Sequence, residues 1–225
     1  MGPVLALLLA DGRFPGGGYA HSLGLEQAVA DGLASRGVAA FIAARLRLVA
    51  EPEARLAVAA RRAALRDGVA GAIAVDRECA ARCPSPVLRE TARRSGGALL
   101  RSASAVWPPP QGALIERYRA ASRGTPRPVA LGVVAAAAGI DDAALAAVAL
   151  YDDAATVASA ALKLLALDPP EASRWVARQA AWIEAASCAV AADQRPLDEQ
   201  PAPAAIGLEL AAAAHHERRE RFFVS

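Results

Sequence analysis

Two pairs of neighbouring aspartates, Asp141-Asp142 and Asp152-Asp153, are the strongest candidates for catalytic chemistry in this sequence. They are 11 residues apart, or about three turns of a helix, so both pairs could lie on one face. Carboxylates so placed could hold Mg²⁺ for a diphosphate substrate. Asp141 has an alternative role, because it follows Gly139 at a predicted helix start, where an aspartate caps the helix. Neither pair extends to a third carboxylate at the spacing of prenyl-diphosphate enzymes, which disfavours an enzyme of that class.

Thiol and imidazole groups suggest a second kind of chemistry, metal binding. Cys79 and Cys83 would share one helix face, but no CxxC or HxxxH pair exists to complete a four-ligand site. We therefore expect small buried thiols. The neighbours His215, His216 and Glu217 would point about 100° apart on a helix, which favours a surface role in partner contact over joint chelation. The sequence predicts no metal site and no cofactor.

The stretch Gly16-Gly17-Gly18 and the pair His21-Ser22 are further candidates. A phosphate-binding loop needs a lysine followed by Ser or Thr at a helix start, whereas this chain continues Tyr-Ala-His-Ser. Adjacent residues do not face each other as nucleophile and base, and no third group is present to orient them. We therefore expect a turn at the glycines and a helix cap at Ser22.

The composition indicates helices. Hydrophobic residues make up 55% of the 225 residues and aromatic residues only 4%, and alanine, leucine and arginine, all strong helix formers, are abundant. The net charge is +2, and acidic residues are scattered among the arginines. This pattern is typical of a solvated mixed surface and not of a nucleic-acid binder.

The cysteine count and the apolar segments predict a cytoplasmic protein with no membrane partner. Three cysteines cannot form a disulfide framework, which favours a reducing compartment. The apolar start lacks a basic region and runs into Asp11 and Arg13, unlike a signal peptide. Asp152 and Asp153 interrupt the longest apolar stretch, 143–167.

Helical periodicity between proline and glycine breaks predicts one all-α domain over residues 1–225, a bundle of about ten helices. Residues 193–203 are proline-rich and polar, and are predicted to be a linker before the C-terminal helix and tail. The predicted helices are 22–32, 35–49, with Ser35 as a cap, 53–66, 69–82, 86–105, 111–122, 128–138, 142–167, 171–192 and a last helix from about residue 206.

The chain ends in two consecutive phenylalanines beside Arg221. Such an ending would normally fray into solvent. In a chain with so few aromatic residues, Phe222 and Phe223 form either a strap on the core or a docking element that orders on binding. Both interpretations stay open. The proline-rich segment favours a tail that is loosely packed after about Ile206.

Several segments resemble the UreF family of urease accessory proteins. Residues 7–29 (LLLADGRFPGGGYAHSLGLEQAV) are similar to the family's N-terminal signature, and the close from His216-Glu217 to Arg-Phe-Phe-Val-Ser is similar to its C-terminal one. Residues 89–100 and 128–139 resemble the arginine-rich central helix and the Gly-containing apolar segment. The chain departs from the family at Gly12, at the absent histidine near Pro126, and at residues 166–169, where Pro-Leu-Gly-Gln is usual.

The resemblance implies an all-α homodimer that is not a catalyst. Similar proteins bind UreD (also called UreH) and recruit the GTPase UreG to deliver nickel to apo-urease. Carried over by position, the resemblance places partner-binding residues in the two signatures and, with Tyr151 and Lys163, on the helix between them. The predicted set is Pro15, Tyr19, His21, Ser22, Glu26, Tyr151, Lys163, His216, Glu217, Arg221, Phe222 and Phe223. The alternatives are an all-α enzyme that uses the aspartate pairs on a diphosphate substrate and an arginine-rich protein that binds nucleic acid.

Overall fold

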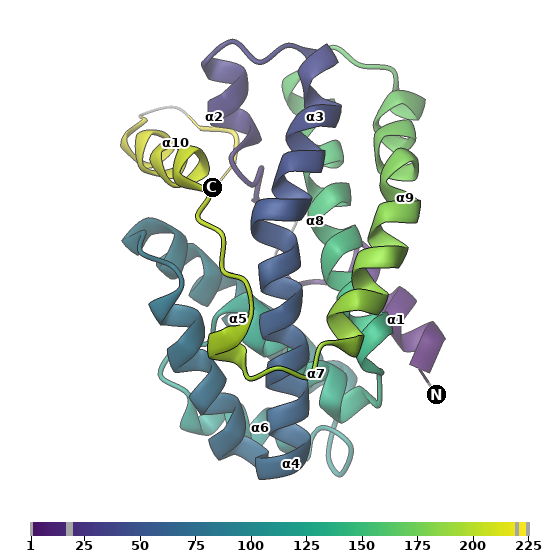
Figure 1. The fold of residues 1–225 in the computed structure, drawn as a ribbon, viewed down its shortest axis with the longest axis vertical. Helices are drawn as coiled ribbons and strands as arrows, with labels where there is room; N and C mark the ends of the chain where they lie inside the picture. Colours follow the sequence, from purple (N-terminus) through teal and green to yellow (C-terminus); the bar gives the residue numbers. More distant parts are fainter. Residues whose placement is uncertain (1, 17–19, 219–220, 224–225) are drawn as a thin grey trace.

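A computed structural model describes residues 2–16, 20–218 and 221–223 of the chain. The predicted all-α fold is confirmed, since the regular elements of these ranges are helices and none is a strand. Figure 1 shows α3 and α4 as one long rod with α8 and α9 beside it. The elements are α1 (Gly2–Ala10), α2 (Leu25–Ala30), α3 (Ser35–Arg45), a π-helical turn η2 (Leu46–Ala50), α4 (Glu51–Ala81), α5 (Pro86–Val106), α6 (Ala113–Ala121), α7 (Arg127–Ala138), α8 (Asp142–Leu164), α9 (Pro169–Ala192), a 3-10 turn η3 (Leu197–Glu199) and α10 (Ile206–Glu217).

The rod from α3 to α4 contains two irregular points. The predicted break between helices near Pro52 is wrong. A π-helical turn accommodates the proline without ending the helix, and in it the Glu51 amide donates to the Leu46 carbonyl, five residues back. At Gly68 the predicted break is confirmed, since this glycine has φ 64° and ψ −142°, outside the helical range. The helical rod is therefore continuous through Pro52, whereas at Gly68 it is kinked.

Four smaller corrections concern helix ends. α1 was not predicted. Helix α2 begins at Leu25 and not at Ser22, because Leu23 and Gly24 have left-handed φ values of 55° and 88°. Ser35 is the first residue of α3 and provides no side-chain cap. Helix α8 ends at Leu164, three residues before the predicted end.

The core lies where α7 passes between α4 and α5, with α8 and α9 closing the other side. Nearly every side chain of α7 is buried. Close approach requires glycine at one point, since a Cβ on Gly132 would lie 2.3 Å from the Ala57 carbonyl oxygen. The core residues of α8 include Leu145 and Val157, both fully buried. Around α7 the core is therefore rich in alanine and valine, and the backbone of α4 approaches α7 closely at Gly132.

Helix α8 is long and apolar enough to cross a membrane by length and composition, and in the described residues no other helix is. More than half of its most apolar window is buried inside the protein, and Asp152 and Asp153 lie within the helix. Its apolar character is accounted for by its position in the bundle core. Two large apolar side chains of α8 lie partly outside the core, since Tyr151 is 43% and Leu162 is 38% exposed.

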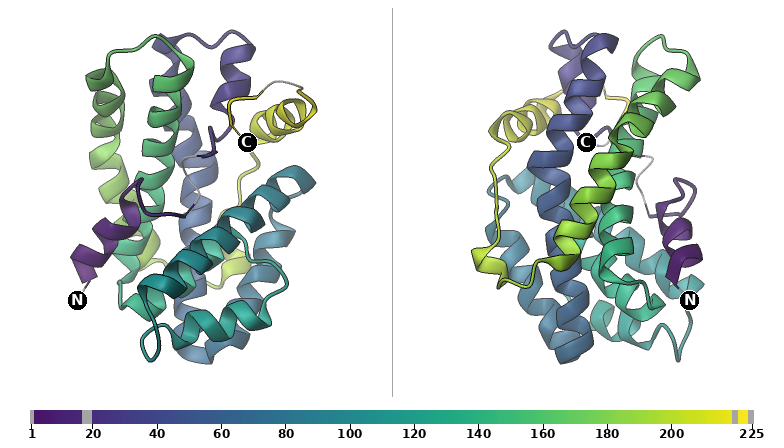
Figure 2. Two further views of the ribbon diagram at one scale, coloured as in Figure 1. Left: turned by 180° about the vertical axis from the view of Figure 1, so that it is seen from behind. Right: turned by 45° about the vertical axis from the view of Figure 1, so that its right-hand side comes forward.

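Residues 193–203 are not a free linker. They contain the 3-10 turn η3 and run along α4, whose arginines hold them. Arg55 pairs with Asp193 at 2.7 Å, Arg62 donates to the Asp193 carbonyl at 2.6 Å, and Arg82 donates to the Leu197 carbonyl. The segment brings α10 back beside α2, on the opposite side of the bundle from α9 (Figure 2).

Candidate functional site

The Glu26 side chain is the centre of the site. It lies in the first turn of α2 and is only 4% exposed. Ser22, fully buried, accepts a hydrogen bond from the Glu26 amide through its Oγ at 3.3 Å. The predicted N-cap role of Ser22 is therefore wrong, since Gly24 holds the N-cap position, although the Ser22 hydroxyl still accepts from an amide of the first turn. This turn directs the carboxylate of Glu26 inward.

The Glu26 carboxylate binds the C-terminal segment through three contacts. His215 Nε2 lies 2.9 Å from Oε2, and the amides of Phe222 and Phe223 donate to Oε1 and Oε2 at 2.8 Å and 3.0 Å. Burial raises the pKa of Glu26, but these three partners lower it by more, so the pKa lies below the ordinary value. A carboxylate near one end of the chain is thus the acceptor for amides near the other end.

The two phenylalanines of the tail have opposite environments. Phe223 is 7% exposed, and its ring lies 5.1 Å from Lys163 Nζ of α8. Phe222 is 84% exposed. The prediction of loose packing after Ile206 is therefore wrong for His215 and Phe223, because Glu26 and the core take up their side chains and amides. The strap interpretation is therefore confirmed for Phe223, whereas docking through the exposed Phe222 stays a prediction.

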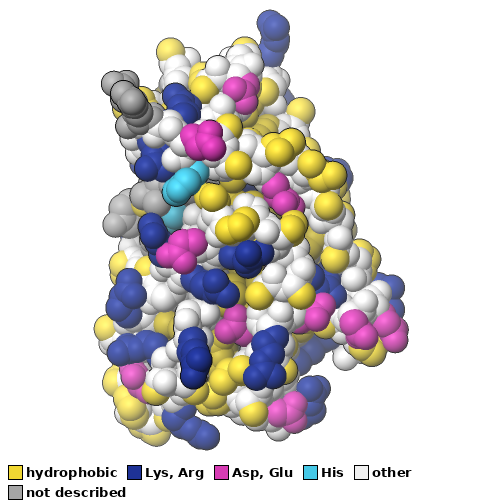
Figure 3. Space-filling view, turned by 90° about the vertical axis from the view of Figure 1, so that its left-hand side faces the viewer, with side chains coloured by type: hydrophobic (Ala, Val, Ile, Leu, Met, Phe, Trp, Pro, Cys, Tyr) yellow, Lys and Arg dark blue, Asp and Glu magenta, His cyan; other side chains and the backbone are white. Residues whose placement is uncertain are grey.

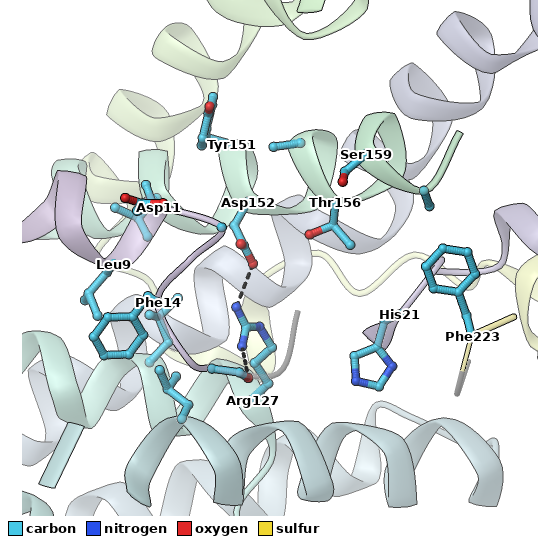
Figure 4. Close-up of a pocket in the computed structure, with 18 of the residues that line it drawn as sticks. Leu9, Asp11, Phe14, His21, Arg127, Tyr151, Asp152, Thr156, Ser159 and Phe223 are labelled. Carbon is cyan, nitrogen blue, oxygen red and sulfur yellow. Dashed lines mark hydrogen bonds and ion pairs between the residues drawn. The ribbon is translucent and has the colours of Figure 1, made fainter. Parts of the chain in front are cut away.

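Several of the predicted residues line one small cavity of about 220 Å³ between α1, α8 and the signature loop. Figure 4 shows His21, Tyr151 and Phe223 among its walls. Lys163 also lines it. His21 Nε2 lies 3.0 Å from Ser95 Oγ of α5, and burial, with the nearby charge of Arg127, lowers the pKa of His21.

The signature loop before His21 is tied to the bundle. The carbonyl of Pro15 accepts from Ser102 Oγ at 2.6 Å, and that of Gly16 accepts from Arg127 Nη1 at 3.2 Å. Arg127 also pairs with Asp152 at 2.6 Å, so that one arginine joins the loop to α8 (Figure 4). Tyr19 lies outside the described residues.

The remaining predicted residues lie on the surface around the tail. His216 and Glu217, at the end of α10, are exposed, and so is Arg221. The structure therefore brings Glu26, Lys163 and Phe223 together and places the exposed end of α10 near them. The expected surface role is wrong for His215, which is 3% exposed and contacts Glu26, whereas Ser95, which contacts His21, was not selected from the sequence. His215 could have been inferred from its place one residue before His216 in the C-terminal signature.

The aspartate pairs do not form the shared cation site suggested by their spacing. Asp153 receives two hydrogen bonds from Arg45, at 3.0 Å and 2.6 Å, and both side chains are 8% exposed. Asp142 pairs with Arg61 and Arg62 at 2.6 Å and 2.7 Å. Each of these carboxylates is thus neutralised by arginine.

The fourth aspartate of these pairs, Asp141, caps α8, since its Oδ1 accepts from the Ala144 amide at 2.8 Å. This confirms the alternative role expected from its position after Gly139. Among the described residues no group of three or more His, Cys, Asp and Glu side chains could hold a metal ion.

Glu53 is a polar residue that sequence reasoning did not select. It lies just after the π-helical turn and is half-buried, near the charged side chains of Asp152 and Asp153 on α8. Burial and the nearby Asp153 raise the pKa of Glu53 to about 7, although Arg45 and Arg127 oppose the shift. A glutamate directly after Pro52, at the start of the predicted helix 53–66, was the available signal.

The expectation of small buried thiols on one helix face is confirmed in part, since Cys79 is buried but Cys83 is half-buried and lies beyond the end of α4. Cys79 is 9% exposed, and burial raises the pKa of its thiol to about 12. Cys83 donates to the Ser85 carbonyl with a distance of 3.8 Å, and burial raises its pKa as well. Neither thiol has the lowered pKa of a reactive cysteine or a metal ligand.

The fold and the site together define an all-α protein in which a buried carboxylate near the N-terminus holds a C-terminal tail that keeps one aromatic ring exposed. The sequence model of the UreF family matches residues 34–180. Three relatives are each named urease accessory protein UreF. The protein of Mycobacterium sp. (strain JLS) is 34% identical over 97% of both chains. Those of Mycobacterium marinum and Mycobacterium tuberculosis are each 36% identical over 75% of both chains. The chain belongs to the UreF family of urease accessory proteins.

Proposed function

We propose that this chain is a cytoplasmic, non-catalytic adaptor that binds UreD (UreH) and recruits the GTPase UreG for nickel insertion into apo-urease. Membership in the UreF family supports the urease context. The observation that carries the adaptor role is the tail, in which the ring of Phe222 is 84% exposed while the amides of Phe222 and Phe223 donate to Glu26. An exposed aromatic ring on a pre-ordered backbone is suited to be a binding hot spot.

The pairing of polar groups supports a role without catalysis. The carboxylates with the best spacing for chemistry are paired with arginines, and the His21 ring is directed to Ser95. A catalytic acid or base needs access to its substrate, and these groups are engaged within the protein. We therefore propose that the exposed surfaces of the chain carry its function by binding other proteins, and that it has no nucleic-acid or membrane partner.

We further propose that the chain acts as a homodimer through the side of α8 and α1. Tyr151 is 43% exposed on α8, and Val4 and Leu7 of the neighbouring α1 are 71% and 70% exposed. Apolar side chains in such positions favour burial against a second surface. The tail, with Phe222, would remain free for UreD.

Activation of apo-urease tests the adaptor proposal. Purified apo-urease, UreD, UreG, GTP and Ni²⁺ are combined with the wild-type chain or with Phe222→Ser, and urease activity is measured. The control variant Leu65→Ser changes a side chain that is 56% exposed on α4, away from the tail. Activity should fall with Phe222→Ser and persist with Leu65→Ser. Equal activation by both variants, or activation without the chain, would refute the role proposed for the tail.

A further inference from the structure

A second and larger hollow opens between α5 and α10. It has a volume of about 780 Å³, within the range of roughly 300–1,000 Å³ of ligand sites. We call it the α5–α10 groove, and its walls include Val87, Arg89 and Arg93 of α5 and Leu208, Glu209 and Ala212 of α10. Figure 3 looks onto this side of the molecule and shows Lys and Arg side chains in its lower half, with hydrophobic atoms between them.

The first half of α5 faces this groove without being covered. In the second half of the helix, Leu99, Leu100 and Ala103 are buried against α7 and its neighbours. None of residues 86–94 is buried, although this half contains Val87 and Leu88. A helix half that carries apolar side chains without packing them is a candidate surface for another chain.

The floor of the groove is apolar. Leu56 of α4 is 5% exposed, while Leu48 of the π-helical turn is 40% exposed, and both line the hollow. Ala80 near the end of α4 and Leu208 of α10 continue the floor. The floor therefore favours the apolar side of an amphipathic partner.

The charges along the groove are predominantly positive on the α5 side. Seven arginines and five carboxylates line it among the described residues. Three carboxylates are satisfied by lining arginines, in the pairs Arg45–Asp153, Arg127–Asp152 and Arg94–Glu90, and Arg82 pairs with Glu78 outside the lining. Among the lining residues, three arginines then have no described carboxylate within 4 Å: Arg89, Arg93 and Arg221. Two lining carboxylates, Glu53 and Glu209, have no described arginine partner.

Arg89 and Arg93 are four residues apart on α5 and so share one face of the helix. The guanidinium of Arg89 donates to the carbonyls of Cys83 and Pro84, which fixes it beside the connection between α4 and α5. Glu53 carries only part of a negative charge near neutral pH, because burial raises its pKa to about 7. The basic edge of the groove is thus opposed mainly by Glu209 on the far wall.

We propose that the α5–α10 groove binds an acidic amphipathic helix of another protein, with its apolar side on the floor and its carboxylates along Arg89 and Arg93. The occupant is argued from charge and shape, since an acidic edge complements Arg93 and the donors of Arg89 that its bonds to Cys83 and Pro84 leave over. A second copy of α1 fits less well, because α1 has no acidic residue. The inference does not rest on UreD or UreG, and its test uses neither.

The probe is a fluorescein-labelled designed helix of about 15 residues, near the length at which isolated helices become stable, with leucine at positions i, i+3, i+4 and i+7 and glutamate on one flank. Fluorescence anisotropy measures its binding to the full chain. Two matched peptides serve as controls, one with lysine in place of glutamate and one with the same composition but a broken period. The acidic periodic peptide should bind, and both controls should bind roughly tenfold more weakly or less.

Variants of the chain then locate the binding. Arg93→Glu should weaken the affinity of the chain for the acidic peptide by roughly fivefold to tenfold, and Arg93→Gln should weaken it by less. Arg36→Glu makes the same charge change at an exposed position of α3 outside the groove and should leave binding within about twofold. Ala80→Trp, which fills the floor, should abolish binding while circular dichroism shows the helical fold retained.

Three results would overturn the proposal. One is equal binding of the acidic, basic and aperiodic peptides. Another is acidic-peptide binding that is unaffected by both Arg93→Glu and Ala80→Trp in folded protein. The third is self-association of the chain that blocks the probe and is lost with Ala80→Trp, since the occupant would then be a second copy.

Discussion

Glu26 joins two parts of the chain that are far apart in the sequence, and no sequence pattern predicts these contacts. Its carboxylate accepts from His215, Phe222 and Phe223, residues 189 to 197 positions away. Hydrogen bonds to a charged acceptor contribute about 1.5–3 kcal/mol each when the alternative is an unsatisfied buried group. The attachment of the tail therefore depends strongly on the charge of this one residue.

Replacing Glu26 by Gln should loosen the tail without unfolding the bundle. The shape is kept, but the negative charge is lost and the new NH₂ group faces backbone donors, so we expect a cost of about 1–3 kcal/mol in local stability. Amide hydrogen exchange at Phe222 and Phe223 should accelerate by roughly fivefold to a hundredfold, while exchange in α7 stays slow. Unchanged exchange at these two amides would contradict the role of Glu26.

The same attachment should weaken in acid. The folded-state pKa of Glu26 lies below its ordinary value of 4.5. The stability that it contributes is therefore fully present above that pH and is lost as the pH falls through the folded-state pKa. Exchange at the tail amides should become faster below about pH 4.5 in the wild type, beyond the intrinsic effect of pH, and should lack this added step in Glu26→Gln.

Arg45 is the second residue whose loss should be costly. It is 7% exposed, pairs with Asp153 and donates to the Leu23 carbonyl at 2.8 Å. Arg45→Ala leaves a buried carboxylate without its cation, and we expect a loss of about 3–5 kcal/mol in the free energy of unfolding. Urea denaturation measures it, with the exposed Arg36→Ala as a control within about 0.5 kcal/mol of wild type. A loss below about 1 kcal/mol for Arg45→Ala would contradict the role of this buried ion pair.

At the scale of elements, features that depend on neighbouring residues could be predicted from the sequence, and pairings between distant residues could not. The break at Gly68 and the cap at Asp141 could be predicted because each depends on neighbours within a few residues. The pairing of Arg45 with Asp153 spans 108 positions and leaves no periodic trace in the sequence. The bridged break at Pro52 was missed because a π-helical turn depends on how the rod packs and not on the proline alone.

The α4–α7 contact gives a prediction at this scale. A Cβ at Gly132 would approach the Ala57 carbonyl oxygen to 2.3 Å, and backbone cannot move aside cheaply. Gly132→Ala should therefore destabilise the protein by about 1–3 kcal/mol despite the better helix propensity of alanine. Gly207→Ala in α10 meets nothing within 4 Å and should be neutral or stabilising by up to about 1 kcal/mol. Thermal melts of the two variants should move in opposite directions, and equal shifts would contradict the packing.

At the scale of the whole molecule, the proposed dimer depends on the exposed side of α8 and α1. Tyr151→Asp places a charge at its centre and should convert a dimer to a monomer in light scattering without lowering the melting temperature. Leu65→Asp, at another exposed apolar position, should leave the dimer intact. A wild-type chain that is monomeric at high concentration, or a dimer that Tyr151→Asp does not disturb, would disprove this interface.

The central claim is that the tail of this chain, held by Glu26, presents Phe222 to UreD. The most direct measurement is the affinity of purified UreD for the wild-type chain and for Phe222→Ser by titration calorimetry, with melting temperatures as a check on folding. Because Phe222 is 84% exposed, the substitution should not change the melting temperature. The account predicts a loss of about 2 kcal/mol or more, roughly thirtyfold in Kd. A Kd within about twofold of wild type, with both chains folded, would contradict it.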